Sequence, residues 1–243
     1  MYPEICSIGP FTIYSYGLML VMGFVVSSFL AAQQAKRQGM SPDVIFNLAF
    51  LAFICGVIGA RIFYVINNFS YYLNKPAEIV MLQRGGLAWF GGLIFGTLAA
   101  VVYIKRKKLS VYKILDLIVP FVALAQSIGR VGCLLNGCCY GRHAEFGIYF
   151  PVHDAILIPT QVYSSLLLIF IYIILRIFQD RPHKDGQIFY AYLFLYAIKR
   201  FFIEFFRADS PVFFFGKTLF QVICVVFFII SVFSLIRISK EKK

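Results

Sequence analysis

Residues 43–67 read DVIFNLAFLAFICGVIGARIFYVIN, and this stretch is the clearest sign of the fold class. A helix needs roughly 20 mostly apolar residues to cross the hydrocarbon of a bilayer, and this run is long enough while carrying two charges, Asp43 at its edge and Arg61 within it. Six further runs predict spans at about 13–33, 87–104, 114–137, 158–178, 187–206 and 216–237. We therefore expect an all-α polytopic membrane bundle of seven transmembrane helices, built as one integral membrane domain over residues 1–243.

The composition agrees with a chain that lies mostly within a membrane. Hydrophobic residues make up 60% of the sequence and charged residues 14%, whereas soluble domains have about 45–50% apolar and about 25% charged residues. The net charge of +12 comes mainly from Lys and Arg in short loops beside the apolar runs. Such residues orient helices and contact anionic headgroups, so we expect membrane lipids as partners and no nucleic acid.

The basic residues gather in alternate loops. Four groups lie at residues 36–37, 105–113, 176–184 and 237–243, and the loops between them hold fewer. The positive-inside rule predicts an external N-terminus and a cytoplasmic C-terminus. The first residues lack a basic n-region and a small-residue cleavage site, so we expect the first run to stay as a span.

Charged side chains inside the predicted spans mark functional candidates, because each costs at least about 2.5–3.5 kcal/mol on insertion scales. Helical spacing places four polar residues on one face of the sixth span: Tyr196, Arg200, Glu204 and Arg207. Arg130 adds a charge in the fourth span. Converging arginines suit a phosphate, since a guanidinium donates bidentate hydrogen bonds and stays charged when desolvated. The alternative is an Arg–Glu–Arg ladder that only joins this helix to a neighbour.

The fourth span runs into GRVGCLLNGCCYGR at residues 129–142. Its glycines let backbones or a ligand come close, and Asn136 adds a polar group. Cys133, Cys138 and Cys139 match no familiar zinc spacing and no His falls at ligand spacing, so we expect no metal and no cofactor. These cysteines are expected to be small buried apolar residues, with a thiol pair at the outer face as the alternative.

Six segments in order resemble the bacterial prolipoprotein diacylglyceryl transferases, and together they cover nearly the whole chain. They are YSYGLML (14–20), GARIFYV (59–65), RGGLAWFGGLI (84–94), SIGRVGCLLNGCCYGR (127–142), IPTQVYSS (158–165) and YAIKRFFIEFFRADS (196–210). The resemblance implies a multi-pass enzyme of the cytoplasmic (inner) membrane with seven spans and an external N-terminus. Such an enzyme moves the diacylglyceryl group of phosphatidylglycerol to the lipobox cysteine of a prolipoprotein signal peptide and releases glycerol phosphate.

The resemblance also implies roles for individual residues. Arg130 and Arg200 would be catalytic and would bind the lipid phosphate. Substrate-binding positions would be Tyr16, Arg61, Asn136, Gly141, Tyr196, Glu204 and Arg207. Two motifs depart from the family pattern: Phe90 stands where the family usually has His, and Cys133 and Cys138 stand where Asn and Glu are typical.

The replacement of the family His removes a proposed proton acceptor. Tyr16, Tyr196 and Glu204 are the candidate substitutes. Two other functions stay open from the sequence: a paralogue that transfers a different lipid group, with Cys138 or Cys139 as a covalent relay, and a non-enzymatic protein that binds or transports a phospholipid.

Overall fold

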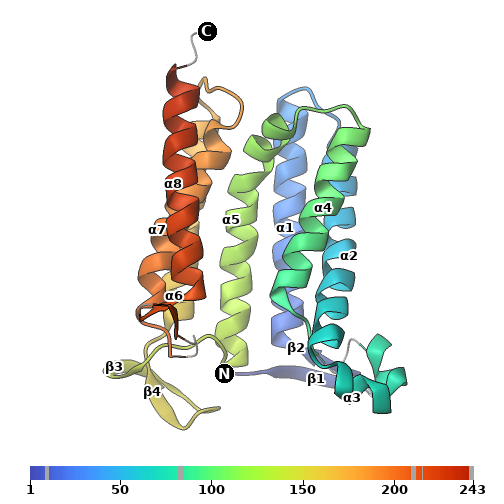
Figure 1. Ribbon diagram of the computed structural model, residues 1–243, viewed down its shortest axis with the longest axis vertical. Coiled ribbons are helices and arrows are strands. Elements are labelled where there is room, and N and C mark those ends of the chain that lie inside the picture. Colours follow the sequence, from blue (N-terminus) through green and yellow to red (C-terminus); the bar gives the residue numbers. More distant parts are fainter. Residues whose placement is uncertain (9–10, 82–84, 209–211, 215, 241–243) are drawn as a thin grey trace. The chain divides into compact units, whose positions relative to one another are not determined.

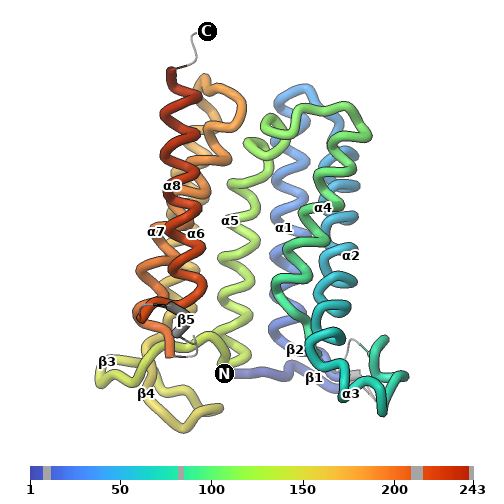
Figure 2. Tube along the Cα trace, viewed as in Figure 1, coloured from blue at the N-terminus to red at the C-terminus, as the bar shows by residue number. Residues whose placement is uncertain are grey.

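The computed structural model describes residues 1–8, 11–81, 85–208, 212–214 and 216–240. The chain divides into two compact units, traced in Figure 1 and Figure 2. One unit consists of Met1–Leu30 with Leu115–Lys243, and the other of Ala31–Ile114. We call them the terminal unit and the central unit.

Helices account for most of the described residues. The α-helices are α1 (Ser15–Arg37), α2 (Pro42–Asn67), α3 (Phe69–Asn74), α4 (Trp89–Arg106), α5 (Val111–Asn136), α6 (Thr160–Gln179), α7 (Gln187–Glu204) and α8 (Leu219–Lys240), and a 3-10 helix, η1, covers Pro76–Val80. All seven predicted runs coincide with long helices, with bounds that differ by a few residues.

Six of the helices, α1, α2, α4, α5, α6 and α8, are long and apolar enough to cross a membrane. The chain is therefore a polytopic helical membrane protein. The seventh predicted span forms α7, which has 18 residues but carries three charges, Lys199, Arg200 and Glu204. These charges distinguish α7 from the six apolar helices.

The all-α architecture is confirmed, and three small antiparallel sheets accompany the helices in the described residues. Each has two strands: β1 (Glu4–Ile8) with β2 (Phe11–Tyr14), β3 (His143–Phe150) with β4 (Ala155–Leu157), and β5 (Val212–Phe214) with β6 (Lys217–Thr218). Strands of two to eight residues are too short for a search for span-length apolar runs to find.

In the central unit, α2 and α4 pack closely along their length, as Figure 2 shows. A Cβ atom added to Gly59 of α2 would lie 2.7 Å from the carbonyl oxygen of Gly91 in α4, and one added to Gly96 would lie 3.0 Å from that of Ala52. Such distances allow no side chain, so these glycines permit close backbone approach. The paired glycines beside Trp89 are thus part of a helix-packing surface.

In the terminal unit, the core joins α5, α6 and α7, and α8 lies alongside α7 in Figure 1. Asp116, a charged residue within α5, accepts hydrogen bonds from the backbone N–H groups of Gly186 (2.6 Å) and Phe189 (2.7 Å). These groups belong to the first turn of α7, which has no intrahelical acceptors for them. A carboxylate at a helix N-terminus is stabilised by the helix dipole, so Asp116 has a structural role.

The loop after α5 is tied to the end of α7. The N–H of Gly141 donates to the carbonyl of Ile158 (2.9 Å), and the N–H of Arg142 donates to that of Phe206 (2.8 Å). These bonds bring the end of α5, the base of the β3–β4 hairpin and the end of α7 together.

Candidate functional site

The polar face predicted for α7 contains a buried ion pair. The Nη2 atom of Arg200 lies 2.9 Å from Oε2 of Glu204, and the two residues are 6% and 3% exposed. The hydroxyl of Thr218, just before α8, donates to Oε1 of Glu204 at 2.9 Å. The Arg200 guanidinium also lies over the ring of Phe220, 4.6 Å from its centroid. Glu204 therefore holds Arg200 in place and joins α7 to the start of α8.

Lys199 is a buried basic residue of α7 that the site predicted from the sequence does not include. Its ammonium lies 4.7 Å from the centroid of the Tyr196 ring, a geometry in which the ring quadrupole attracts the charge. Lys199 lies within electrostatic range of Arg130, Arg200 and Arg207. Its position next to Arg200, in a helix with few charges, was the sequence signal for it.

Arg130 enters the same region from α5. It is partly buried and lies within electrostatic range of Tyr196 and Arg207. Within the described parts of the chain, neither Arg130 nor Lys199 forms an ion pair with a carboxylate, whereas Arg200 is neutralised by Glu204. We refer to Arg130, Lys199, Arg200 and Arg207 as the cationic cluster.

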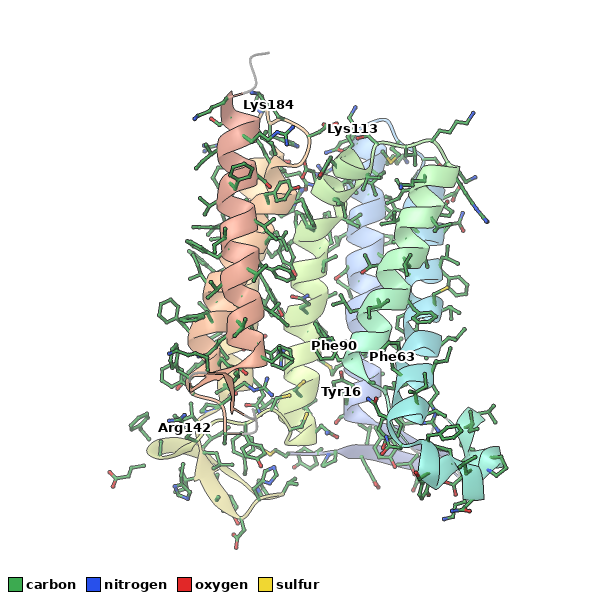
Figure 3. The ribbon with its side chains drawn as sticks, in the orientation of Figure 1. Tyr16, Phe63, Phe90, Lys113, Arg142 and Lys184 are labelled. Carbon is green, nitrogen blue, oxygen red and sulfur yellow. The ribbon has the colours of Figure 1, made fainter. Side chains whose placement is uncertain are left out.

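Tyr16 reaches the cationic cluster from the start of α1, where Figure 3 labels it. A Cβ atom added to Gly132 of α5 would lie 2.9 Å from Cβ of Met19 and 3.4 Å from Cα of Tyr16. The missing side chain at Gly132 lets α1 approach α5, which places Tyr16 within electrostatic range of Arg130. The predicted role of this glycine in close approach is confirmed.

The three cysteines lie beside Arg130. Their Sγ atoms are all within 4.8 Å of one another, and Cys133 and Cys139 are within electrostatic range of the Arg130 guanidinium. The pKa of the Cys139 thiol is lowered, first by hydrogen bonds from Cys133 and Cys138 and further by the charges of the nearby arginines. The sequence predicted small buried apolar residues, with a thiol pair as the alternative, and the structure brings all three thiols together.

Two side chains of α6 fix the loop that carries these cysteines. The amide Nε2 of Gln161 donates to the carbonyl of Cys138, and the hydroxyl of Thr160 donates to that of Cys139, both at 2.6 Å. Asn136, the last residue of α5, has its side chain within hydrogen-bonding reach of the Cys138 thiol. The loop is therefore held from both sides.

Gly141 and Arg207 form an isolated antiparallel bridge. A Cβ atom on Gly141 would lie 2.7 Å from Cβ of Ile158 and 2.8 Å from the carbonyl oxygen of Phe206. The absence of a side chain at Gly141 thus lets the loop seat Arg207 directly after α7.

Comparison with known proteins shows the family of this chain. The family model for prolipoprotein diacylglyceryl transferase matches residues 3–237. The chain belongs to this family. It is 34% identical to the phosphatidylglycerol–prolipoprotein diacylglyceryl transferase of Clostridium tetani over 86% of each chain. It is also 34% identical to that of Streptococcus pyogenes serotype M5, over 96% of this chain and 94% of the relative.

Arg61 of this family member has a structural task in the central unit. Its five N–H groups all donate to backbone carbonyls, at distances from 2.6 to 3.3 Å. The acceptors are Glu78, Ile79, Met81, Gly85 and Gly86.

The guanidinium of Arg61 also lies 5.5 Å from the centroid of the Tyr72 ring. Arg61 is one of the residues that line a pocket of about 400 Å³. Binding a substrate phosphate there would require Arg61 to give up bonds that hold the segment before α4. Its assignment as a substrate-binding residue stays a prediction.

Phe90, which replaces the family's usual His, lies in the first turn of α4 in the central unit, where Figure 3 labels it. Its ring contacts that of Trp89 edge to face, with centroids 5.1 Å apart. An aromatic hydrocarbon ring cannot accept a proton at this position. The transferase must therefore deprotonate its acceptor by other means.

The loop between α5 and α6 brings His153 against the turn that follows α5. Its Nε2 atom lies 2.8 Å from the carbonyl oxygen of Gly137, and its ring centroid is 4.1 Å from that of Tyr140. These contacts tie the end of the β3–β4 hairpin to the turn that follows α5.

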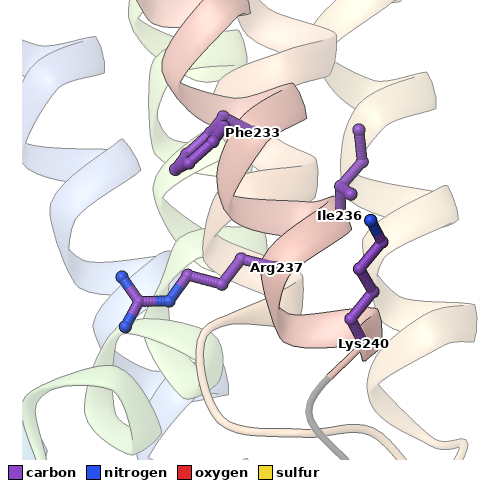
Figure 4. Close-up of a pocket in the computed structure, with 4 residues that line it drawn as sticks. All are labelled: Phe233, Ile236, Arg237 and Lys240. Carbon is purple, nitrogen blue, oxygen red and sulfur yellow. The ribbon is translucent and has the colours of Figure 1, made fainter.

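A second pocket lies near the C-terminal end of α8 (Figure 4). It has a volume of about 360 Å³ and is lined by Phe233, Ile236, Arg237 and Lys240. Apolar side chains beside two long cations suit the boundary between acyl chains and headgroups. At about 1.5 Å per residue, this end of α8 is more than 20 Å from Phe220, so the pocket is separate from the cationic cluster.

Proposed function

We propose that this chain transfers the diacylglyceryl group of phosphatidylglycerol to the lipobox cysteine thiol of a prolipoprotein signal peptide and releases glycerol phosphate. The observation that carries the proposal is Arg130, a partly buried guanidinium without an ion-pair partner in the described chain. A charge in a membrane helix is costly unless a counter-charge meets it. The phosphodiester of the lipid supplies that counter-charge.

The two catalytic arginines have different tasks. Arg130 binds the phosphate as a free fork of donors, whereas Arg200 is aimed and held by Glu204 at 2.9 Å. A donor fixed before the reaction pays no reorganisation cost as charge develops. Tyr16, Tyr196 and Arg207 complete the wall of the substrate site around them.

The reaction is a nucleophilic substitution at carbon. The acceptor sulfur, as thiolate, attacks the glyceryl carbon that bears the phosphate, and a carbon–sulfur bond forms. The carbon–oxygen bond to the phosphate breaks, and its electron pair leaves with glycerol phosphate. Arg130 and Arg200 stabilise the charge on this leaving group.

Glu204 is poorly placed to act as the base. Its Oε2 atom is paired with Arg200 and its Oε1 atom accepts the Thr218 hydroxyl. Accepting a proton would break up the pair that positions Arg200. Glu204 therefore acts on the substrate through Arg200, and the acceptor thiol loses its proton elsewhere.

The chain carries out this reaction as a single integral membrane domain of the bacterial cytoplasmic membrane, with seven spans and an external N-terminus. Placing α7 as the seventh span is supported by the burial of its three charges, each at 6% exposure or less. Arg200 and Glu204 pair with each other and Lys199 lies on an aromatic ring, so α7 presents these charges to protein rather than to lipid.

The test is transfer by the purified protein in detergent, with phosphatidylglycerol and a lipobox peptide as substrates. Mass spectrometry should detect both the diacylglyceryl peptide and free glycerol phosphate. A peptide with Ser in place of the acceptor Cys is the matched control and should give neither. Bound phosphatidylglycerol without turnover, next to an active relative, would contradict the proposal and favour a lipid-binding protein.

A further inference from the structure

The proposed reaction needs a thiolate, and the usual His of the family is absent at Phe90. Close to Arg130, however, the structure gathers three thiols whose Sγ atoms all lie within 4.8 Å of one another. Cys133 is on the last turn of α5, and Cys138 and Cys139 follow in the loop. Three converging thiols are a ligand set for a soft metal ion.

The spacing of the sulfur atoms fits zinc. Tetrahedral Zn²⁺ holds thiolates at about 2.3 Å, which puts neighbouring sulfurs roughly 3.8 Å apart. Sulfurs already within 4.8 Å need to move by only about an ångström to reach that geometry. No fourth His, Cys, Asp or Glu belongs to this group in the described chain. Three protein ligands with one open position are typical of catalytic rather than structural zinc.

The loop is built to present these sulfurs. Cys139 has φ +63°, a left-handed conformation that residues other than glycine rarely adopt. It keeps this conformation because two side chains hold the neighbouring carbonyls. Gln161 donates to the carbonyl of Cys138 and Thr160 donates to that of Cys139, both at 2.6 Å. The Oε1 atom of Gln161, a residue only 1% exposed, has no hydrogen-bond partner. Backbone strain held by buried polar contacts is common at functional sites.

The charges around the thiols favour a metal–thiolate centre. Zn²⁺ with three thiolates carries a net charge of −1, and a fourth thiolate makes it −2. Arg130 and Arg207 both lie within electrostatic range of Cys139. Nearby guanidinium groups, with Arg207 available while Arg130 binds the phosphate, stabilise such an anionic centre, whereas they would repel a bare cation.

We propose that Cys133, Cys138 and Cys139 bind one zinc ion whose open fourth position takes the acceptor cysteine of the lipobox. The inference rests on the proposed function, because it assigns the deprotonation step of that reaction. It also replaces the expectation from the sequence that this chain binds no metal. The spacing of the cysteines matches no familiar motif, and the thiols meet only through the turn that ends α5.

The acceptor thiol displaces water from zinc and releases its proton to solvent, and a zinc–sulfur bond forms. Coordination keeps a thiol deprotonated at neutral pH. The bound thiolate then attacks the glyceryl carbon, the electron pair of the carbon–oxygen bond leaves with glycerol phosphate, and the product thioether leaves zinc as water returns. No oxidant or reductant takes part.

The first test measures metal in protein purified in detergent without chelators. Elemental analysis of the wild type should find close to one zinc ion per chain. Cys133→Ser, Cys138→Ser and Cys139→Ser should each lose most of it. Cys55→Ser, a matched change in α2, should keep it. Wild-type protein without zinc, or with a Cys133–Cys138 disulfide found by mass spectrometry, would overturn the inference.

The second test measures whether the acceptor cysteine binds the metal at its open fourth position. Co²⁺ in place of zinc should give sulfur-to-cobalt charge-transfer bands, and a lipobox peptide should intensify them. The same peptide with Ser for Cys should not. A spectrum unchanged by the Cys peptide would overturn binding of the acceptor at the metal.

Activity separates this inference from the proposed function. Removing the metal with a chelator should slow transfer by about 10²-fold, because activation of a nucleophile typically accelerates a reaction by that factor. Added zinc, but not magnesium, should restore the rate. Full transfer by metal-free protein would overturn the zinc site and leave the transferase function intact. A zinc-loaded protein that never forms diacylglyceryl peptide would instead refute the proposed function. A lipid adduct trapped on Cys138 or Cys139 would overturn the zinc step in favour of a covalent relay.

Discussion

Substitutions at Arg200 can show whether this arginine takes part in catalysis or only pairs with Glu204 to join α7 to a neighbouring helix. Arg200→Ala removes a donor held against Glu204 at 2.9 Å and leaves a carboxylate that is 3% exposed without its counter-charge. Breaking a buried pair from one side costs about 3–5 kcal/mol of stability. Losing a preorganised donor to the leaving phosphate costs about 10²–10³ in rate. The single variant therefore suffers both effects at once.

The double variant Arg200→Ala with Glu204→Gln separates the two effects. Gln is neutral, so no buried charge is left unpaired, and its amide oxygen can still accept the Thr218 hydroxyl that now bonds Oε1. We expect the double variant to regain most of the lost stability while its transfer rate stays at least about 10²-fold below that of the wild type.

The assay combines thermal unfolding in detergent with the rate of diacylglyceryl-peptide formation. Trp89→Phe, an aromatic replacement in the central unit, is the control and should keep both values near those of the wild type. A double variant that recovers both stability and transfer would refute the phosphate assignment, because Arg200 would then only join helices.

Changes at three other residues test individual contacts. Arg61→Lys keeps the charge but replaces five fixed N–H donors with three on one atom. Backbone carbonyls then lose hydrogen bonds worth about 1–3 kcal/mol each, so the unfolding temperature should fall. An unchanged melting curve would contradict this. Asp116→Ala removes the acceptor of two N–H groups at the start of α7 and should cost about 0.5–2 kcal/mol of stability in the same unfolding assay, with transfer largely kept at low temperature. Gly141→Ala puts a Cβ 2.8 Å from the carbonyl oxygen of Phe206 and should displace the bridge to Arg207. The transfer rate should fall as a result. A rate equal to that of the wild type would disprove this role of Gly141.

Much of the fold could be predicted because its main signal is local. A helix that crosses a bilayer must satisfy its backbone internally and be apolar for about 20 residues, so each span is visible in its own segment. The small sheets were missed because hairpins of this length leave no comparable signal. The pairing of Arg200 with Glu204 was also accessible from the sequence, since it depends only on the four-residue spacing of one helix.

The tasks of the other polar residues were not accessible in the same way. Arg61 and Asp116 both read as charges inside spans, yet one binds carbonyls 17 to 25 residues further on and the other binds N–H groups at least 70 residues away. Lys199 and Arg200 are neighbouring basic residues of α7, but Lys199 lies over the Tyr196 ring whereas Arg200 pairs with Glu204. A hydrogen-bonding partner distant in the sequence is chosen by packing, which spacing along one helix does not encode.

By itself, the sequence determined that this is a polytopic membrane protein, placed its helices, and carried the motifs of the prolipoprotein diacylglyceryl transferases. The packing of the helices determines which polar groups are already paired within the protein and which are left to meet a substrate. It also brings together, beside Arg130, three cysteines whose spacing matches no familiar motif. The physical reason is that burial in lipid is a property of a segment, whereas a site is a set of distances between segments.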